Sequence, residues 1–130
     1  MLIIGDIAGQ YKTLMALLEQ CPNEEPISLG DMIDRGPDSK KVLDFFMKNG
    51  RAILGNHEAM MLDAIATGRY GAWQDWIGNG GGATMRSLGI EKMPLTEDHD
   101  LLLDPYCEWI DKLPLFIREP GLIITHAPIP

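Results

Sequence analysis

A short pattern recurs three times within the first 56 residues of this 130-residue chain. In each copy, an apolar run leads into a glycine and then into a carboxylate or an amide. The copies are Leu2-Ile3-Ile4-Gly5-Asp6, Ile27-Ser28-Leu29-Gly30-Asp31 and Ala52-Ile53-Leu54-Gly55-Asn56, so the polar residue returns after a step of 25 residues. Short apolar runs that end at glycine are typical of buried strands. The pattern therefore predicts three strands, each with a polar side chain at its end.

The segments between these strands have helical periodicity. Tyr11 to Gln20 places leucines on one face, and Ser39 to Asn49 does the same with aliphatic and aromatic residues before Gly50. Strand, helix, strand, helix, strand is the βαβαβ order, which predicts a parallel sheet with flanking helices. Because parallel strands end at the same sheet edge, the polar residues are expected to meet where open α/β folds bind ligands.

The second half of the chain is less regular. We expect, in chain order, a helix over His57 to Thr67, a loop over Gly68 to Gly82, a helix over Asp98 to Leu113, and strands at Leu115 to Ile117 and Leu122 to Thr125. Pro105 is expected to kink or split the second of these helices, because proline removes an amide donor. The two strands are expected to form a hairpin turned by Glu119-Pro120-Gly121, with His126 at its end.

Composition excludes several classes of protein. Eleven Lys and Arg residues against 19 Asp and Glu residues give a formal charge of −8, which argues against a nucleic-acid partner. No apolar run approaches the roughly 18–20 residues of a membrane span, and the first residues do not resemble a secretion signal. Cys21 and Cys107 lie in no metal or redox spacing, so we expect reduced thiols, a cytoplasmic location and a single domain over residues 1–130.

Four residues at predicted strand ends form a candidate metal site: Asp6, Asp31, Asn56 and His126. Two carboxylates about 4 Å apart repel by roughly 4 kcal/mol at an effective dielectric constant near 20, and a bound cation removes that cost. Three oxygen ligands and one nitrogen suit manganese, iron or zinc. Taken one at a time, these residues could equally make turns and helix caps.

Three further residues point to phosphate chemistry. The guanidinium of Arg35 can hold two phosphate oxygens in a planar fork, although a surface ion pair is its alternative. His57 could protonate a leaving oxygen, with Asp34 fixing its tautomer, or it could be a solvated residue at a helix start.

Three segments together resemble the signatures of a known family. Gly5-Asp6-Ile7-Ala8-Gly9, Gly30-Asp31-Met32-Ile33-Asp34-Arg35-Gly36 and Gly55-Asn56-His57-Glu58 are similar to those of the calcineurin-like metallophosphoesterases. The similarity is greatest to the phosphoprotein phosphatase branch and its bacteriophage lambda-type serine/threonine phosphatases, and it includes the segment from Trp76 to Gly82 and Ile124-Thr125-His126-Ala127. It implies a calcineurin-like α/β sandwich whose second sheet is incomplete, because the family continues beyond its His-Ala motif.

The resemblance implies a hydrolase of phosphoric monoesters that uses two divalent cations to deliver a bridging hydroxide in line to phosphorus. By position, Asp31 would bridge the cations, Asp6 would bind the first, and Asn56 with His126 would bind the second. The same matching gives the remaining roles: general acid for His57, its partner for Asp34, and phosphate clamp for Arg35. The substrate would be a phosphorylated protein or a small phosphoester.

Two departures from the family pattern lead to further expectations. Ala8 stands where the family has a histidine ligand of the first metal, and the family's later histidine and arginine have no counterpart up to Pro130. The domain is thus expected to be truncated at its C-terminus, with impaired activity and self-association through the incomplete sandwich. His99 is expected to be a solvated residue at a helix start.

Other segments are expected to be structural. The run Asn79-Gly80-Gly81-Gly82 should shape the backbone near the site, while Trp73, Trp76 and Met60-Met61 should lie in the core. Two alternative functions remain open: a symmetrical dinucleoside tetraphosphate hydrolase, and a non-catalytic relic that binds a metal or phosphate.

Overall fold

The computed structural model describes residues 1–91 and 95–128 and contains a parallel three-stranded sheet. Its strands, in spatial order, are β1 (Leu2–Ile4), β2 (Pro26–Ser28) and β3 (Arg51–Ala52). Helices α1 (Tyr11–Gln20) and α2 (Ser39–Phe46) make the two crossovers. The predicted βαβαβ order is therefore confirmed, although the third strand is only two residues long.

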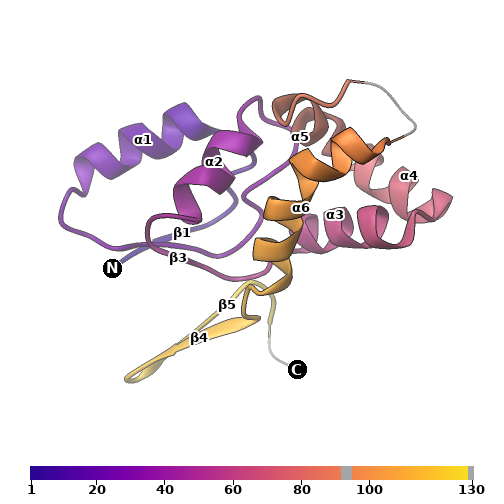
Figure 1. Cartoon of the computed structure of the whole chain (residues 1–130). Coiled ribbons are helices and arrows are strands. Elements are labelled where there is room, and N and C mark those ends of the chain that lie inside the picture. The colour runs from indigo at the N-terminus through magenta and orange to yellow at the C-terminus, as the bar shows by residue number, and fades with distance from the viewer. Residues whose placement is uncertain (92–94, 129–130) are drawn as a thin grey trace.

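The two faces of this sheet have different partners. The helices pack on one face, where Val42, Leu43 and Phe46 of α2 are buried in the main core (Figure 1). A hairpin of β4 (Phe116–Glu119) and β5 (Leu122–Thr125) packs against part of the other face, and its antiparallel pairing confirms the predicted hairpin. Ile3 of β1 stays exposed on that face. A separate apolar cluster joins hairpin and sheet, and its buried members are Ile27, Ile53, Ile117 and Ile124.

Polar contacts also attach the hairpin to the sheet. Arg51 on β3 forms ion pairs with Glu25, which precedes β2, and with Glu119 on β4. The amide of Leu54 donates to the carbonyl of Pro114, 2.9 Å away. These contacts set the position of β5, and hence of His126, against the carboxyl ends of the parallel strands.

The remaining helices are α3 (Asn56–Thr67), α4 (Tyr70–Gly78), α5 (Gly81–Ser87) and α6 (Glu97–Asp111). The predicted loop over Gly68 to Gly82 is wrong, since α4 occupies most of it. Gly71 and Gly78 lower the helix propensity of this segment, but the burial of Ala72 and Trp76 stabilises the helix. Gly68 instead ends α3 in a left-handed conformation with φ of 64°.

Helix α6 runs through Pro105 without a break, so the predicted split is wrong. Its Leu103, Tyr106 and Ile110 are buried, and this packing compensates for the amide donor that Pro105 lacks. No helix among the described residues is long and apolar enough to cross a membrane.

Candidate metal and phosphate site

The loops after β1, β2 and β3 approach one another so closely that glycine is required. A Cβ atom added at Gly30 would lie 2.5 Å from Cα of Gly55, and one at Gly55 would collide with the backbone nitrogen of Asp31. A Cβ at Gly36 would collide with the carbonyl oxygen of Ala8. Two glycines of the recurring pattern, Gly30 and Gly55, together with Gly36 therefore allow the loops to approach closely, whereas a Cβ at Gly5 would meet no atom within 4 Å.

Four non-glycine residues in these loops have left-handed backbone conformations: Ala8, Asp31, Asp34 and Arg35, with φ of 46°, 53°, 75° and 64°. Such a conformation costs roughly 1–2 kcal/mol for a non-glycine residue. Residues held this way cluster at functional sites, where the surrounding structure compensates for the strain.

Glu58, on the first turn of α3, supports two of the loops. Its carboxylate is fully buried and accepts hydrogen bonds from the amides of Asp31 (2.8 Å), Met32 (2.7 Å) and Gly55 (3.1 Å). Burial raises the pKa of Glu58, while the hydrogen bonds from Asp31 and Met32 lower it in part. This role of Glu58 was not predicted from the sequence, although an acid three residues after a helix cap is a recognisable capping signal.

Three of the predicted metal ligands meet at the sheet edge. Nε2 of His126 lies 2.9 Å from Oδ1 of Asn56 and 3.7 Å from Oδ1 of Asp31. The other ring nitrogen, Nδ1, lies 2.7 Å from the carbonyl oxygen of Leu29 and must donate to it. In a neutral ring, Nε2 is then an unprotonated acceptor that faces two acceptor oxygens.

This donor set fits a divalent cation, because a cation satisfies all three acceptors at once. A histidine whose other nitrogen donates to a backbone carbonyl is also the usual arrangement of a metal ligand. Residues 1–91 and 95–128 contain no group of three or more His, Cys, Asp and Glu side chains that could hold a metal ion. The set described above has two such side chains, Asp31 and His126, and the amide of Asn56.

The donors for a first cation are fewer. Asp6 follows β1 with an exposed side chain, and no hydrogen bond or ion pair of its carboxylate occurs in the described part of the chain. Ala8, two residues later, offers only a methyl group. In the described part of the chain, no contact joins the carboxylate of Asp6 to that of Asp31, so a shared first cation stays a prediction from the sequence.

His57 and Asp34 form a buried pair beside the predicted metal ligands. Nδ1 of His57 lies 2.7 Å from Oδ2 of Asp34, and the side chains are 11% and 0% exposed. The backbone amide of His57 donates to Oδ1 of Asp31 at 3.1 Å, which links this pair to one of those predicted ligands. A solvated His57 at a helix start, the alternative interpretation of the sequence, is not what the structure shows.

Arg35 lies at the rim of the site with an exposed side chain. Its amide donates to the carbonyl of Gly80 at 3.1 Å, and its Nε lies 3.4 Å from the carbonyl of Asn79. In the described part of the chain it forms no ion pair, so its guanidinium is available to an anion. The Asn79-Gly80-Gly81-Gly82 run thus shapes the backbone next to the site, in agreement with the sequence analysis.

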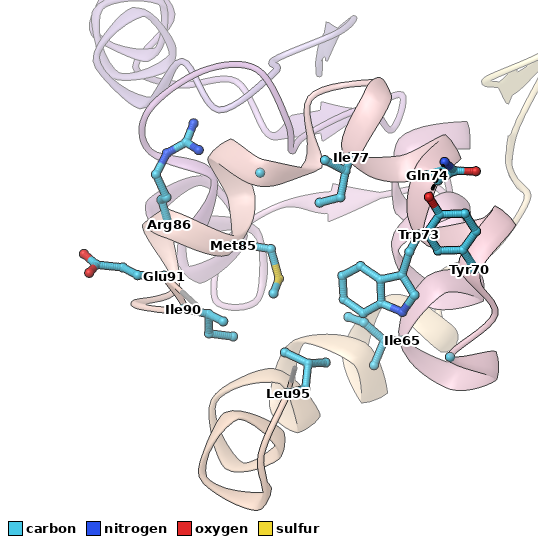
Figure 2. A pocket seen from close by; sticks show the side chains of 12 residues that line it. Ile65, Tyr70, Trp73, Gln74, Ile77, Met85, Arg86, Ile90, Glu91 and Leu95 are labelled. Atoms are coloured by element: carbon cyan, nitrogen blue, oxygen red, sulfur yellow. Dashed lines mark hydrogen bonds between the residues drawn. The ribbon is translucent and has the colours of Figure 1, made fainter. Parts of the chain in front are cut away.

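Trp73 and Trp76 lie one turn apart on α4, with their ring centroids 5.6 Å apart. Trp76 is fully buried, which agrees with its predicted place in the core, but its Nε1 also donates to Asp34. Trp73 is half-buried and borders an apolar cavity of about 1030 Å³ between α3, α4, α5 and the start of α6 (Figure 2). None of the predicted site residues is among those that line this cavity.

His99 lies at the start of α6, where it is half-buried, and its ring accepts a hydrogen bond from the amide of Thr96.

A parallel α/β sheet whose strand ends bring together the predicted metal-ligand oxygens, a histidine–aspartate pair and an arginine is the arrangement expected of a metal-dependent phosphoesterase. The chain belongs to the calcineurin-like phosphoesterase family, whose model matches residues 1–130.

Individual relatives agree with this assignment. The chain is 33% identical over 137 residues to serine/threonine-protein phosphatase 1 of Salmonella typhimurium, covering 98% of this chain and 58% of the relative. It is 34% identical over 133 residues to a symmetrical bis(5'-nucleosyl)-tetraphosphatase of Neisseria gonorrhoeae, covering 97% and 42%. The chain therefore spans about half the length of these relatives.

Solved structures support the fold. The crystal structure of a metallophosphoesterase from Sphaerobacter thermophilus aligns with a TM-score of 0.58 at 18% identity, covering 91% of this chain and 42% of that one. That of a candidate diadenosine tetraphosphatase aligns with a TM-score of 0.67 at 22% identity, covering 97% and 49%.

Proposed function

We propose that this chain carries the catalytic site of a phosphoric monoester hydrolase that acts on phosphoserine and phosphothreonine in proteins. The observation that carries the proposal is the pair of His57 and Asp34 beside the converging Asp31, Asn56 and His126. The relative named as a serine/threonine-protein phosphatase supports this choice of substrate. A cytoplasmic location is part of the proposal, and the free Cys21 and Cys107 are consistent with it.

In this proposal, Asp31 would contact two cations, Asp6 the first, and Asn56 with His126 the second. Two divalent cations, with manganese as the expected metal, would supply positive charge to the phosphoryl oxygens and lower the pKa of a bound water. Ala8 leaves the first cation with fewer protein ligands, and we therefore expect low turnover from this chain.

The chain's other residues would act on the substrate. The exposed guanidinium of Arg35 would hold phosphoryl oxygens, which Lys could not match in geometry. Asp34 would hold the proton on Nδ1 of His57, so that the proton on Nε2 is the one delivered to the leaving oxygen. Such general acid catalysis contributes about 10²–10⁴ in rate.

A symmetrical dinucleoside tetraphosphatase is the second candidate. It is favoured by the relatives named for that activity, of which the Neisseria gonorrhoeae protein is 34% identical. Both candidates would use the same cations and the same histidine–aspartate pair, and they differ in the group that leaves phosphorus.

The test is hydrolysis by the full chain with Mn²⁺ of three substrates: p-nitrophenyl phosphate, a phosphothreonine peptide and diadenosine tetraphosphate. The proposal expects release of inorganic phosphate from the peptide, with kcat reduced about 10²–10⁴ in His57→Asn. His99→Asn, which changes a histidine outside the site, is the matched control and should retain activity.

Two results would contradict the proposal. Faster cleavage of the dinucleotide than of the peptide would favour the second candidate. Binding of Mn²⁺ without any turnover that depends on His57 would favour a non-catalytic relic that binds a metal or phosphate.

A further inference from the structure

Asp34 is held by more side chains than a general acid pair requires. Its carboxylate is fully buried and accepts from Oγ1 of Thr84 at 2.6 Å and from Nε1 of Trp76 at 3.0 and 3.1 Å. These donors come from α5 and α4, so the site extends well beyond the loops that carry the family signatures. Neither residue has a role in the sequence analysis beyond the expected burial of Trp76.

The protons around Asp34 can be assigned one by one. The backbone amide of Asp34 donates to Oγ1 of Thr84 (2.9 Å) and to Oγ of Ser39 (3.1 Å). Thr84 has a single hydroxyl proton, and the carboxylate at 2.6 Å can only accept, so this proton belongs to that bond. The hydroxyl of Ser39, 3.0 Å from Oγ1 of Thr84, then donates to Thr84.

The result is a carboxylate whose plane is fixed. The hydroxyl of Thr84 donates to Oδ1 of Asp34, and Nε1 of Trp76 donates to both carboxylate oxygens. Oδ2 also lies 2.7 Å from Nδ1 of His57. Thr84, Trp76 and Ser39 are all fully buried, so water cannot replace a donor that is lost without the packing changing.

We propose that Thr84 and Trp76 are positioning residues for the general acid. By fixing the carboxylate of Asp34, they hold one proton on Nδ1 of His57, so that in the doubly protonated ring the proton on Nε2 is the one transferred to the leaving oxygen, and the neutral ring that remains keeps its proton on Nδ1. This inference rests on the proposed function of His57. The inference has one specific consequence. Loss of the Thr84 hydroxyl should lower kcat for substrates whose leaving group needs a proton and should change kcat little for substrates whose leaving group does not.

The kinetic experiment compares Thr84→Val, which keeps the shape but removes the hydroxyl, with Thr84→Ser, which keeps the hydroxyl. Phenyl phosphate has a poor leaving group and 2,4-dinitrophenyl phosphate a good one. We expect kcat for phenyl phosphate to fall about tenfold or more in Thr84→Val, with little change for the dinitrophenyl ester and with activity retained in Thr84→Ser. An equal fall on both substrates would reveal a purely structural role and overturn the inference.

A second measurement does not require turnover. NMR of the chain labelled with ¹⁵N in its histidine rings reports which nitrogen of His57 carries the proton, with His57→Asn identifying the signals. We expect an Nδ1-protonated ring in the unchanged chain and in Thr84→Ser, and a mixture of tautomers in Thr84→Val. Identical His57 signals in all three proteins would overturn the inference.

Trp76→Phe keeps a ring in the core while removing the Nε1 donor, and it provides the same two readouts if Thr84→Val does not fold. Failure of the proposed function can be distinguished from failure of this inference. In the first case, the expected tautomer shift occurs but no substrate is hydrolysed. In the second, hydrolysis depends on His57 but the tautomer and the leaving-group dependence do not respond to Thr84 or Trp76.

Discussion

Nδ1 of His57 and Oδ2 of Asp34 lie 2.7 Å apart, although 23 residues separate them in the sequence. His57 stands at the start of α3, and Asp34 lies in the loop after β2 with a left-handed φ of 75°. The parallel sheet brings these segments together, and the strained backbone turns the carboxylate toward the ring. The pair is thus a product of sheet topology rather than of a local motif.

Replacing Asp34 with asparagine tests the importance of this pair. In Asp34→Asn, the amide can donate to Nδ1 and no longer stabilises a protonated ring, so we expect kcat on a phosphothreonine peptide to fall about 10²–10⁴. Because the shape of the side chain is conserved, the melting temperature should change far less than after a change of size. Asp38→Asn, at a half-buried carboxylate that forms an ion pair with Lys41, is the control. Equal activity of the two variants would contradict the prediction.

Ala8→His should strengthen cation binding. The left-handed φ of 46° at Ala8 is one that histidine adopts more readily than most residues, so the change should not add backbone strain. We expect isothermal titration with Mn²⁺ to show affinity about tenfold higher or more, or an additional bound cation. Ala66→His, on the exposed part of α3, controls for an added surface histidine. Unchanged titrations would mean that the first cation does not need a ligand at position 8.

Gly80→Ala should displace Arg35. A Cβ at Gly80 would lie 2.6 Å from Cγ and 2.8 Å from the amide nitrogen of Arg35, and the φ of 103° is unfavourable for alanine. We expect a higher KM for phosphoesters together with a lower melting temperature. Gly71→Ala is the matched control, because a Cβ there meets no atom within 4 Å and Gly71 lies in α4, where the change should stabilise the helix by about 1 kcal/mol. Similar KM values for the two variants would contradict this role of Gly80.

Glu58→Gln should weaken the support for the loop that carries Asp31. The buried carboxylate accepts three amide hydrogen bonds, whereas glutamine would turn its NH₂ group toward one or more of those donors. We expect the free energy of unfolding to fall by about 1–3 kcal/mol in chemical denaturation, with weaker Mn²⁺ binding. Glu19→Gln, at an exposed position of α1, should have little effect on either quantity.

The thiol of Cys107 should make the free energy of unfolding depend on pH in the alkaline range. Burial raises the pKa of its thiol from 9.0 to about 11, so the folded chain holds this proton more tightly than the unfolded chain. The free energy of unfolding should therefore fall as pH rises from 9 toward 11, and this fall should be smaller in Cys107→Ser. Denaturation at several pH values measures the difference, and parallel pH profiles of the two proteins would contradict it.

The sequence predicted the sheet well because the apolar-glycine-polar pattern is local and repeats. The same pattern predicted that Asp31 and Asn56 lie at one sheet edge, since parallel strands end on one side, and His126 reaches both of them there. In the described part of the chain, no hydrogen bond or ion pair joins Asp6 to these residues. Helix α4 was not predicted because its glycines have low helix propensity, and the helix is stabilised by tertiary packing that the sequence does not reveal. Thr84 could not be found either, since it lies 50 residues from Asp34 and only the folded chain joins them.

His126 bonds to the carbonyl of Leu29 across 97 residues of sequence, and the hairpin that carries it is the last element of the chain. During synthesis on the ribosome, Asp31 and Asn56 emerge long before their third partner does. The nascent sheet can thus fold before the hairpin docks, and in the proposed site strong cation binding would have to wait for that docking. Cation binding would therefore depend on completion of this part of the fold, and a bound cation would indicate that the hairpin has docked on the sheet.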